Sequence, residues 1–169
     1  DHLMKEPPEG KTAAEGGNLT EGERDSLEIF EETYYNDYVA HSPIEPHTAV
    51  AKFENGKMTV WASTQTPFRA KEEVARYFDM PQENVLIIPP FLGGGFGGKS
   101  RNLQVIEAAR LAKLSGKPVQ VAWTRKEEFC YDSFRPAAII KIKSGISEAG
   151  KINLWDYHVY YAGERGSKQ

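Results

Sequence analysis

A glycine-rich segment, Phe91–Ser100, constrains the fold of this 169-residue chain more than any other part of its sequence. Five of the six positions from 93 to 98 are glycine, and the exception is Phe96. Glycine costs chain entropy, so such a run is useful where the backbone must come very close to another group. The segment follows an apolar run, Val85–Ile88, and precedes a helical pattern that begins near Asn102. A loop in this position directs backbone N–H groups at a docked group, and the helix N-terminus favours an anion.

The same loop matches the phosphate-binding P-loop pattern G-x-x-x-x-G-K-S/T, which starts at Gly93. In that function the glycines would wrap phosphates, Lys99 would reach the terminal phosphate and Ser100 would hold magnesium. The context does not favour it, because Pro89–Pro90 separates the apolar run from the loop and Asp156 is a weak candidate for the acidic magnesium partner. A nucleotide-binding module is therefore the alternative function, and a non-catalytic interaction domain with a glycine turn is a third.

Apolar and polar residues recur with helical and strand periods, which predicts an α+β fold (mixed α/β) with a mixed sheet and two main helices. The predicted order is β-ββ-α-β-α-β-ββ. Strands are expected at 27–38, 49–54, 57–63, 85–88, 118–124, 137–147 and 151–161, and helices at 67–78 and 102–115.

Short sequence patterns support four further predictions about turns and burial. Asn55–Gly56 supplies the pair of positive φ angles that a type I′ hairpin turn requires. The apolar run at 85–88 is expected to be buried on both faces. On the second helix, polar residues recur every three positions from Gln104 to Lys113, which predicts a narrow solvated stripe on an otherwise enclosed helix. Lys126–Glu128 is expected to lie in a solvated turn.

The first 25 residues differ in composition from the rest of the chain. They contain no Val, Ile, Phe, Tyr or Trp, and they carry seven acidic and three basic side chains. Such a segment cannot bury enough apolar surface to order itself, so 1–25 is predicted to be a flexible, linker-like segment and 26–169 to be an α/β domain. The net charge of −3 argues against a nucleic-acid partner, and the single cysteine, Cys130, excludes an internal disulfide and a cysteine-ligated cluster.

Gly93–Lys99 resembles the glycine–phenylalanine loop of the molybdenum hydroxylases, the family of xanthine dehydrogenase and aldehyde oxidase. Further segments resemble family motifs in order along the chain: Glu45–Ala51, Ser63–Gln65, Gly116–Val119, Thr124–Glu128 and Tyr161–Ser167. The last segment is most similar to the isoquinoline 1-oxidoreductase branch, which includes enzymes of the membrane-bound aldehyde dehydrogenase type. The resemblance covers residues 38–167, most of the chain.

The resemblance implies a set of cofactor-binding residues at the loop. In the family, the glutamine that matches Gln65 donates its amide hydrogen bond toward an oxygen ligand of molybdenum; without the resemblance, Gln65 is an exposed loop amide. The loop amides that match Phe96 and Gly97 contact this ligand and the pterin. Without the resemblance, the expected alternative is a tight turn in which the Phe96 ring packs into the core. Gly95 and Gly98 would permit the close approach. No side chain is expected to bind the metal directly.

Ser100 and Arg101 are the predicted substrate-pocket residues. Purine hydroxylases of the family carry glutamate at the position of Ser100, and serine has no carboxylate. The expected substrate is therefore an aldehyde or a neutral N-heterocycle. Lys99 is expected to orient the loop, to neutralise a phosphate or to be solvated at a helix start.

Two histidines, His41 and His47, flank a proline-containing loop with Glu45. A metal site is not expected there, because the spacing patterns of metal ligands are absent.

The resemblance also implies what the parent protein does. The family uses a molybdenum–molybdopterin cofactor, for which the cytosine dinucleotide form is one option here, and a 2Fe–2S cluster on a partner subunit or domain. The parent would hydroxylate its small-molecule substrate with oxygen from water. The family's catalytic base, a glutamate far toward the C-terminus, has no counterpart here, so we expect an inactive internal fragment. Its expected partners are the remaining domains of the same subunit and an iron–sulfur electron-transfer subunit; the sequence leaves the compartment open.

Overall fold

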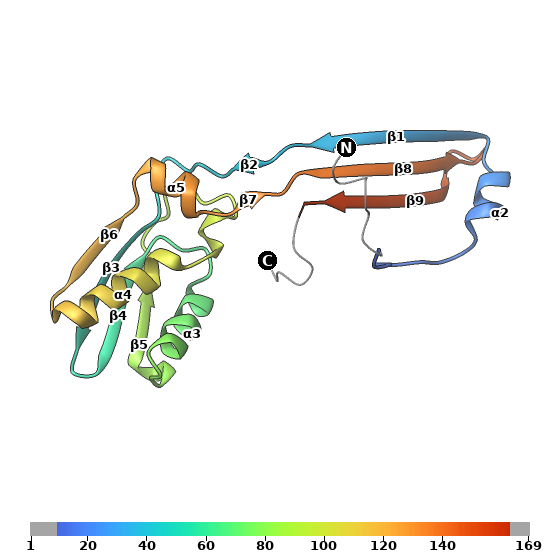
Figure 1. Ribbon diagram of the computed structural model, residues 1–169. Helices are drawn as coiled ribbons and strands as arrows, with labels where there is room; N and C mark the ends of the chain where they lie inside the picture. Colours follow the sequence, from blue (N-terminus) through green and yellow to red (C-terminus); the bar gives the residue numbers. More distant parts are fainter. Residues whose placement is uncertain (1–9, 163–169) are drawn as a thin grey trace. The chain divides into compact units, whose positions relative to one another are not determined.

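The computed structural model describes residues 10–162, and its helices and strands confirm the α+β class (Figure 1). The chain forms two compact units, one made of the continuous stretch Ala40–Arg135 and the other of the segments on both sides of it. Two short strands, β2 (Val39–Ala40) and β7 (Phe134–Arg135), pair where the chain passes between these stretches. Among the described helices, none combines the length and the apolar composition that crossing a bilayer requires.

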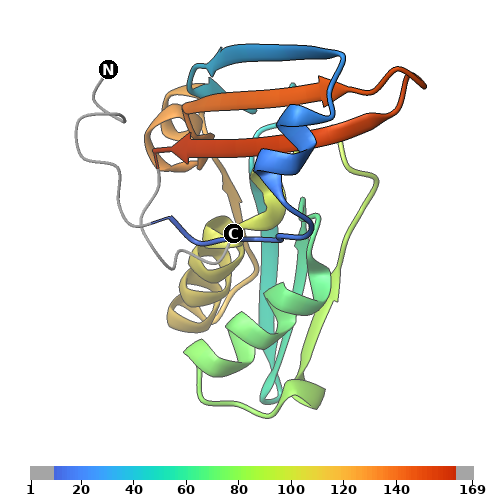
Figure 2. The ribbon, with the colours of Figure 1, turned by 90° about the vertical axis from the view of Figure 1, so that its right-hand side faces the viewer.

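A four-stranded sheet is the framework of the 40–135 unit (Figure 2). Its strands lie in the order β5 (Val85–Ile88), β4 (Lys57–Ala62), β3 (Thr48–Glu54) and β6 (Val119–Ala122). Strand β3 pairs antiparallel with β4 and with β6, whereas β4 and β5 run parallel. A parallel pair requires a crossover connection, which a helix supplies here.

The hairpin turn between β3 and β4 confirms the prediction made from its sequence. Asn55 and Gly56 have φ angles of 52° and 74°, and positive values at both positions are the mark of a type I′ turn. The turn sets the register of the strands, so that Ala51 lies opposite Val60. Both side chains are fully buried, which shows that this register directs the apolar positions into the core.

Helices α3 (Pro67–Tyr77) and α4 (Leu103–Ser115) pack against this sheet and against each other. Small side chains dominate the shared core, and alanine lets the helices approach the strands closely. The core residues are Ala49, Ala51, Met58, Val60, Ala62, Ala70, Val74, Ala75, Val85, Val105, Ala108, Ala109 and Ala112.

Two expectations about burial in this unit are wrong. Strand β5 is not buried on both faces: it is an edge strand, and the side chain of Leu86 is 54% exposed. On α4, Gln104 does not lie in a solvated stripe: it is fully buried, and its Nε2 donates to the carbonyl oxygen of Ser63 at 3.1 Å. Leu114, in contrast, is 73% exposed, so α4 buries one face and is not enclosed.

A helix, α5 (Arg125–Tyr131), replaces the solvated turn that the sequence predicted at 126–128. Thr124 begins it with a capping box: its Oγ1 accepts from the N–H of Glu127 at 3.3 Å, and the Glu127 carboxylate accepts from the N–H of Thr124 at 2.7 Å. Glu128 follows on this helix and is buried rather than solvated. It therefore belongs to the interior of the unit.

The other unit contains a three-stranded antiparallel sheet in the order β1 (Glu28–Asn36), β8 (Ala138–Ile146) and β9 (Ile152–Tyr161). These strands confirm the strand expected near 27–38 and the hairpin expected over 137–161. Most of the Tyr161–Ser167 motif lies outside the described residues.

A short helix, α2 (Leu19–Arg24), lies within the segment predicted to be linker-like. Asn18 caps it, because its Oδ1 accepts from the N–H of Thr20 at 2.9 Å. Residues 1–9 of the same segment lie outside the described part of the chain.

Candidate functional site

An ion pair between Lys99 and Glu45 holds the glycine-rich loop in place within the 40–135 unit. Glu45, on the approach to β3, accepts through Oε2 from Lys99 Nζ at 2.6 Å and from the N–H of Gly93 at 2.9 Å. The Lys99 side chain is fully buried. It is therefore neither solvated nor able to reach a nucleotide phosphate, and the P-loop function is wrong for this loop. Lys99 orients the loop from below.

The charge on Glu45 is stabilised by the same contacts. Desolvation alone would raise the pKa of this carboxyl. The hydrogen bond from Lys99, the hydrogen bond from Gly93 and the charge of Lys99 together outweigh desolvation and lower the pKa below its ordinary value. The carboxylate is therefore ionised at neutral pH and holds both ends of the glycine run.

Gln65 holds the second half of the loop from the connection between β4 and α3. Its backbone N–H donates to the carbonyl oxygen of Lys99 at 2.8 Å, and its side-chain Oε1 accepts from the N–H of Gly97 at 2.9 Å. The side chain is exposed, and its Nε2 donates to no acceptor among the described residues. Because Oε1 is engaged with the loop, the NH₂ group is the free end of this amide.

Two residues of the loop have left-handed backbone. Phe96 has a φ of 53° and Gly97 a φ of 102°. The Phe96 side chain is 76% exposed, so the alternative in which it plugs the core is wrong. A side chain carrying an aromatic ring is uncommon at positive φ, and here the ring lies against Gly94, where an added Cβ would come within 3.3 Å of Phe96 Cε2.

At two further positions of the loop, a neighbouring side chain lies so close to the backbone that only glycine fits. A Cβ on Gly95 would lie 2.4 Å from Gln65 Oε1, and a Cβ on Gly98 would lie 2.8 Å from Asp132 Oδ2. The structure thus brings together Gln65, Gly95, Phe96, Gly97 and Gly98, the five residues predicted to bind the cofactor.

Three backbone N–H groups at the crest of the loop, which is residues 94–96, have no hydrogen-bond acceptor among the described residues. The N–H groups of Gly98 and Ser100 donate within the loop, to Gly95 and Gly97. The crest therefore presents hydrogen-bond donors together with the Gln65 NH₂ group, an arrangement that suits a group rich in oxygen acceptors.

Replacing Gly97 by alanine is expected to destabilise the chain by about 1–2 kcal/mol, because alanine at its φ of 102° is strained. Chemical denaturation measures this loss. The matched variant is Gly150→Ala in the β8–β9 turn, where φ is 70°. It should lose a similar free energy of unfolding but leave cofactor binding intact. A neutral Gly97→Ala would contradict the strained geometry of the loop.

Of the two predicted substrate-pocket residues, only Arg101 lines a hollow of the structure. Ser100 is partly buried, and its carbonyl oxygen accepts from Thr66 Oγ1 at 3.2 Å. Arg101 is exposed and lines a hollow of about 430 Å³ beside α3 and the start of α4. The other lining residues are Arg69, Glu73, Arg76, Tyr77, Asn102, Leu103 and Ile106. Ser100 is not among them, and a substrate role for either residue stays a prediction.

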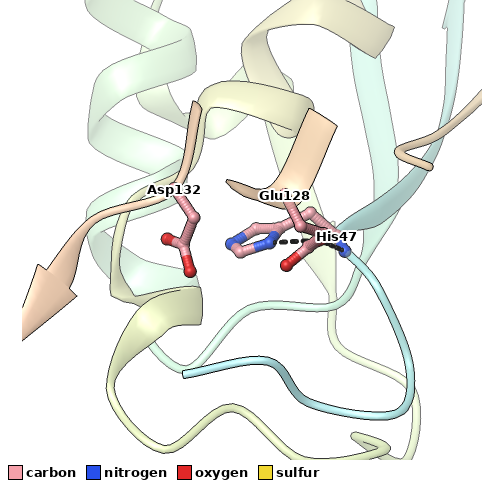
Figure 3. Close-up of side chains that lie close together, drawn as sticks. All are labelled: His47, Glu128 and Asp132. Atoms are coloured by element: carbon pink, nitrogen blue, oxygen red, sulfur yellow. Dashed lines mark hydrogen bonds and ion pairs between the residues drawn. The ribbon is translucent and has the colours of Figure 1, made fainter. Parts of the chain in front are cut away.

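The two histidines of the proline-containing loop find partners that the sequence did not reveal (Figure 3). His47 is 1% exposed, and its Nδ1 lies 2.8 Å from Oε1 of Glu128. His41 Nδ1 lies 3.0 Å from the carbonyl oxygen of Ser133 and 3.5 Å from Oδ2 of Asp132. Glu45 takes no part, because it is engaged with the loop.

Residues 4–164 match a family described as "Molybdopterin cofactor-binding domain". Among curated relatives, the chain is 37% identical over 145 residues to a probable xanthine dehydrogenase subunit of Bacillus subtilis, which covers 85% of this chain and 19% of the relative. It is 30% identical over 150 residues to "Aldehyde oxidoreductase molybdenum-binding subunit PaoC" of Escherichia coli, covering 88% of this chain and 20% of the relative. The chain thus spans about a fifth of the length of these relatives.

A solved structure with the same fold is quinoline 2-oxidoreductase from Pseudomonas putida 86. The TM-score is 0.74 at 21% identity, and the match covers 84% of this chain and 18% of that one. The fold is therefore shared with a solved oxidoreductase, and the family match includes the whole glycine-rich loop.

Proposed function

Because this chain belongs to the molybdopterin cofactor-binding domain family, we propose that its glycine-rich loop and Gln65 form one wall of the molybdenum cofactor site in a larger oxidoreductase subunit. The parent protein hydroxylates an aldehyde or an N-heterocycle with oxygen from water. Other domains of the parent supply the catalytic base, so the 169-residue chain alone is inactive.

The observation that carries this proposal is the set of unpaired donors at the crest of the loop. The Gln65 NH₂ group and the N–H groups of residues 94–96 have no acceptor among the described residues. The carboxylate below them, Glu45, is already paired with Lys99 and does not compete for these donors. Donors without a nearby free anion fit a cofactor that presents oxygen and sulfur acceptors.

When bound, the molybdenum cofactor supplies two-electron redox chemistry that no side chain of this chain provides. The residues of the chain bind and orient it. Gly95 and Gly97 keep the backbone free of Cβ atoms at the contact, and Gln65 donates a neutral hydrogen bond that stabilises developing oxygen charge without adding an ion. The exposed Phe96 ring excludes water from the contact.

The substrate follows from Ser100, which cannot offer a carboxylate to a purine. We therefore favour an aldehyde or a neutral N-heterocycle, with Ser100 and Arg101 nearest to it. Turnover of an aromatic aldehyde or a quinoline by the intact parent, with none of xanthine, supports this choice. The reverse preference would contradict it.

The cofactor form and the electron-transfer partner are further parts of the proposal. The cytosine dinucleotide form is supported if acid treatment of the intact parent releases cytidine monophosphate, and it is contradicted if no nucleotide is released. A 2Fe–2S cluster on a partner subunit is supported if its EPR signal co-purifies with the parent.

Replacing Gly95 by alanine in the intact parent tests the loop contact itself. The added Cβ would lie 2.4 Å from Gln65 Oε1 and displace that flexible side chain, while the fold adjusts at little cost. We expect activity to fall about 100-fold, as it does when catalytic groups are misplaced by an ångström, with an unchanged unfolding midpoint and a reduced molybdenum content. Gly16→Ala, which meets nothing within 4 Å, is the matched control. Full activity of Gly95→Ala would refute the placement.

A further inference from the structure

Three polar side chains that the loop does not use meet at one point inside the 40–135 unit (Figure 3). His47 lies directly before β3, Glu128 lies in α5, and Asp132 is the C-cap residue directly after this helix, four positions from Glu128 and so on the same side of it. One donor atom from each residue lies within 4.8 Å of the other two. The cluster unites a strand and a helix that are distant in sequence.

The Glu128 carboxylate is almost completely buried and only half satisfied. The side chain is 2% exposed. Its Oε1 accepts from Nδ1 of His47 at 2.8 Å and from the backbone N–H of His47. Its Oε2 has no hydrogen-bond partner among the described residues. A buried carboxylate oxygen without a donor is costly, so this oxygen points to a bound partner.

The charges in the cluster point to a cation. The Asp132 side chain is 6% exposed, so two carboxylates are buried close together. Each has an imidazole as its ion-pair partner, His47 for Glu128 and His41 for Asp132. Buried charges in proteins are usually paired or bind a metal, and a divalent ion between these two carboxylates would balance both charges.

We propose that His47, Glu128 and Asp132 form a binding site for a divalent transition-metal ion of the zinc type. Imidazole nitrogen and carboxylate oxygen are both zinc ligands, at about 2.0–2.2 Å from the metal. The ring nitrogen of His47 that faces Glu128 is Nδ1, at 2.8 Å from Oε1, so an ion bound by all three residues would take the place of the hydrogen on this nitrogen. Figure 3 shows the imidazole ring between the two carboxyl groups.

The site lies directly beneath the glycine-rich loop. A Cβ on Gly98 would lie 2.8 Å from Asp132 Oδ2 and 3.0 Å from His41 Nδ1, so the carboxylate is against the loop backbone. An ion held by Asp132 on one side and by His47 on the other would join the loop, α5 and the start of β3. Its role is structural, because it would stabilise the contacts of α5 and the start of β3 with the loop.

Zinc binding to the full 169-residue chain tests the proposal directly. After chelator treatment, calorimetric titration with zinc near neutral pH should show one site, and zinc should raise the unfolding midpoint. Glu128→Gln keeps an acceptor for His47 but removes a charged ligand, and Asp132→Asn does the same for the second acid. We expect each variant to bind zinc at least about tenfold more weakly.

A surface pair provides the control. His158 Nε2 and Asp156 Oδ1 lie 2.9 Å apart with the histidine 58% exposed, so His158→Gln removes an alternative zinc-binding pair without touching the cluster. The proposal holds if this variant binds like the unmodified chain. It is overturned if neither acid variant weakens binding, if His158→Gln abolishes it, or if NMR shows His47 protonated on both nitrogens in excess zinc.

Discussion

Replacing Gln65 by alanine in the intact parent protein is expected to lower kcat about 100-fold, the usual cost of removing a donor aimed at developing oxygen charge. The alanine variant also loses the hydrogen bond that Oε1 accepts from Gly97 at 2.9 Å. Steady-state kinetics should show kcat and kcat/KM falling together, because the interaction is made in the transition state. Thermal unfolding should change little, since the side chain is exposed.

The Gln65→Glu variant tests the NH₂ donor of this side chain separately from its oxygen acceptor. Glutamate keeps an oxygen acceptor for the N–H of Gly97 but replaces the unpaired NH₂ donor with an acceptor. We expect it to preserve the loop and still lose at least as much turnover as Gln65→Ala. Unchanged turnover in both variants would remove Gln65 from the cofactor site.

The largest expected effect on stability comes from Glu45→Gln, which should cost about 3 kcal/mol of unfolding free energy. The variant leaves the fully buried Lys99 ammonium without its anion at 2.6 Å. The matched control is Glu54→Gln, which breaks the exposed Lys52–Glu54 pair and should change stability by less than about 1 kcal/mol. Urea denaturation measures both. Equal losses would mean that the buried pair contributes no more than a surface pair.

The same pair predicts a pH dependence. The pKa of Glu45 is lower in the folded chain than its ordinary value of 4.5, although desolvation opposes the lowering by Lys99 and Gly93. A lowered folded pKa means that the stabilisation is fully present above the ordinary pKa and is lost as pH falls through the folded pKa. Stability should therefore fall below about pH 5, and Glu45→Gln should show a shallower acid dependence than the unmodified chain.

The sequence could predict what depends on neighbouring residues. Asn55–Gly56 determined a hairpin turn. That Gln65 lies against the loop followed only from the resemblance to a family, because it is 32 positions from its partner Gly97. Helix α5 could also have been found, because Thr124 and Glu127 have the spacing of a capping box. The charges of Lys126–Glu128 predict a solvated turn, whereas the capping-box spacing beside them predicts the helix that forms.

Contacts between distant residues could not be predicted in this way. The partner of His47 is Glu128, 81 positions later, and the partner of Lys99 is Glu45, 54 positions earlier. Gln104 is polar yet buried, because a carbonyl oxygen at the end of the sheet accepts its hydrogen bond. Periodicity predicts that polar residues face solvent and apolar residues face the core, and a buried polar group with a remote partner such as Gln104 is an exception. Strand β5 is the opposite exception, because its apolar residue Leu86 is exposed on an edge strand.

The contacts that order the glycine-rich loop have a consequence for how the protein is made. They join residues 54, 48 and 32 positions apart, and such distant contacts form late during folding because closing long loops costs chain entropy. A nascent chain must therefore extend beyond Lys99 and assemble its sheet before the crest takes shape. A cofactor that contacts the crest would therefore bind only after the sheet has assembled.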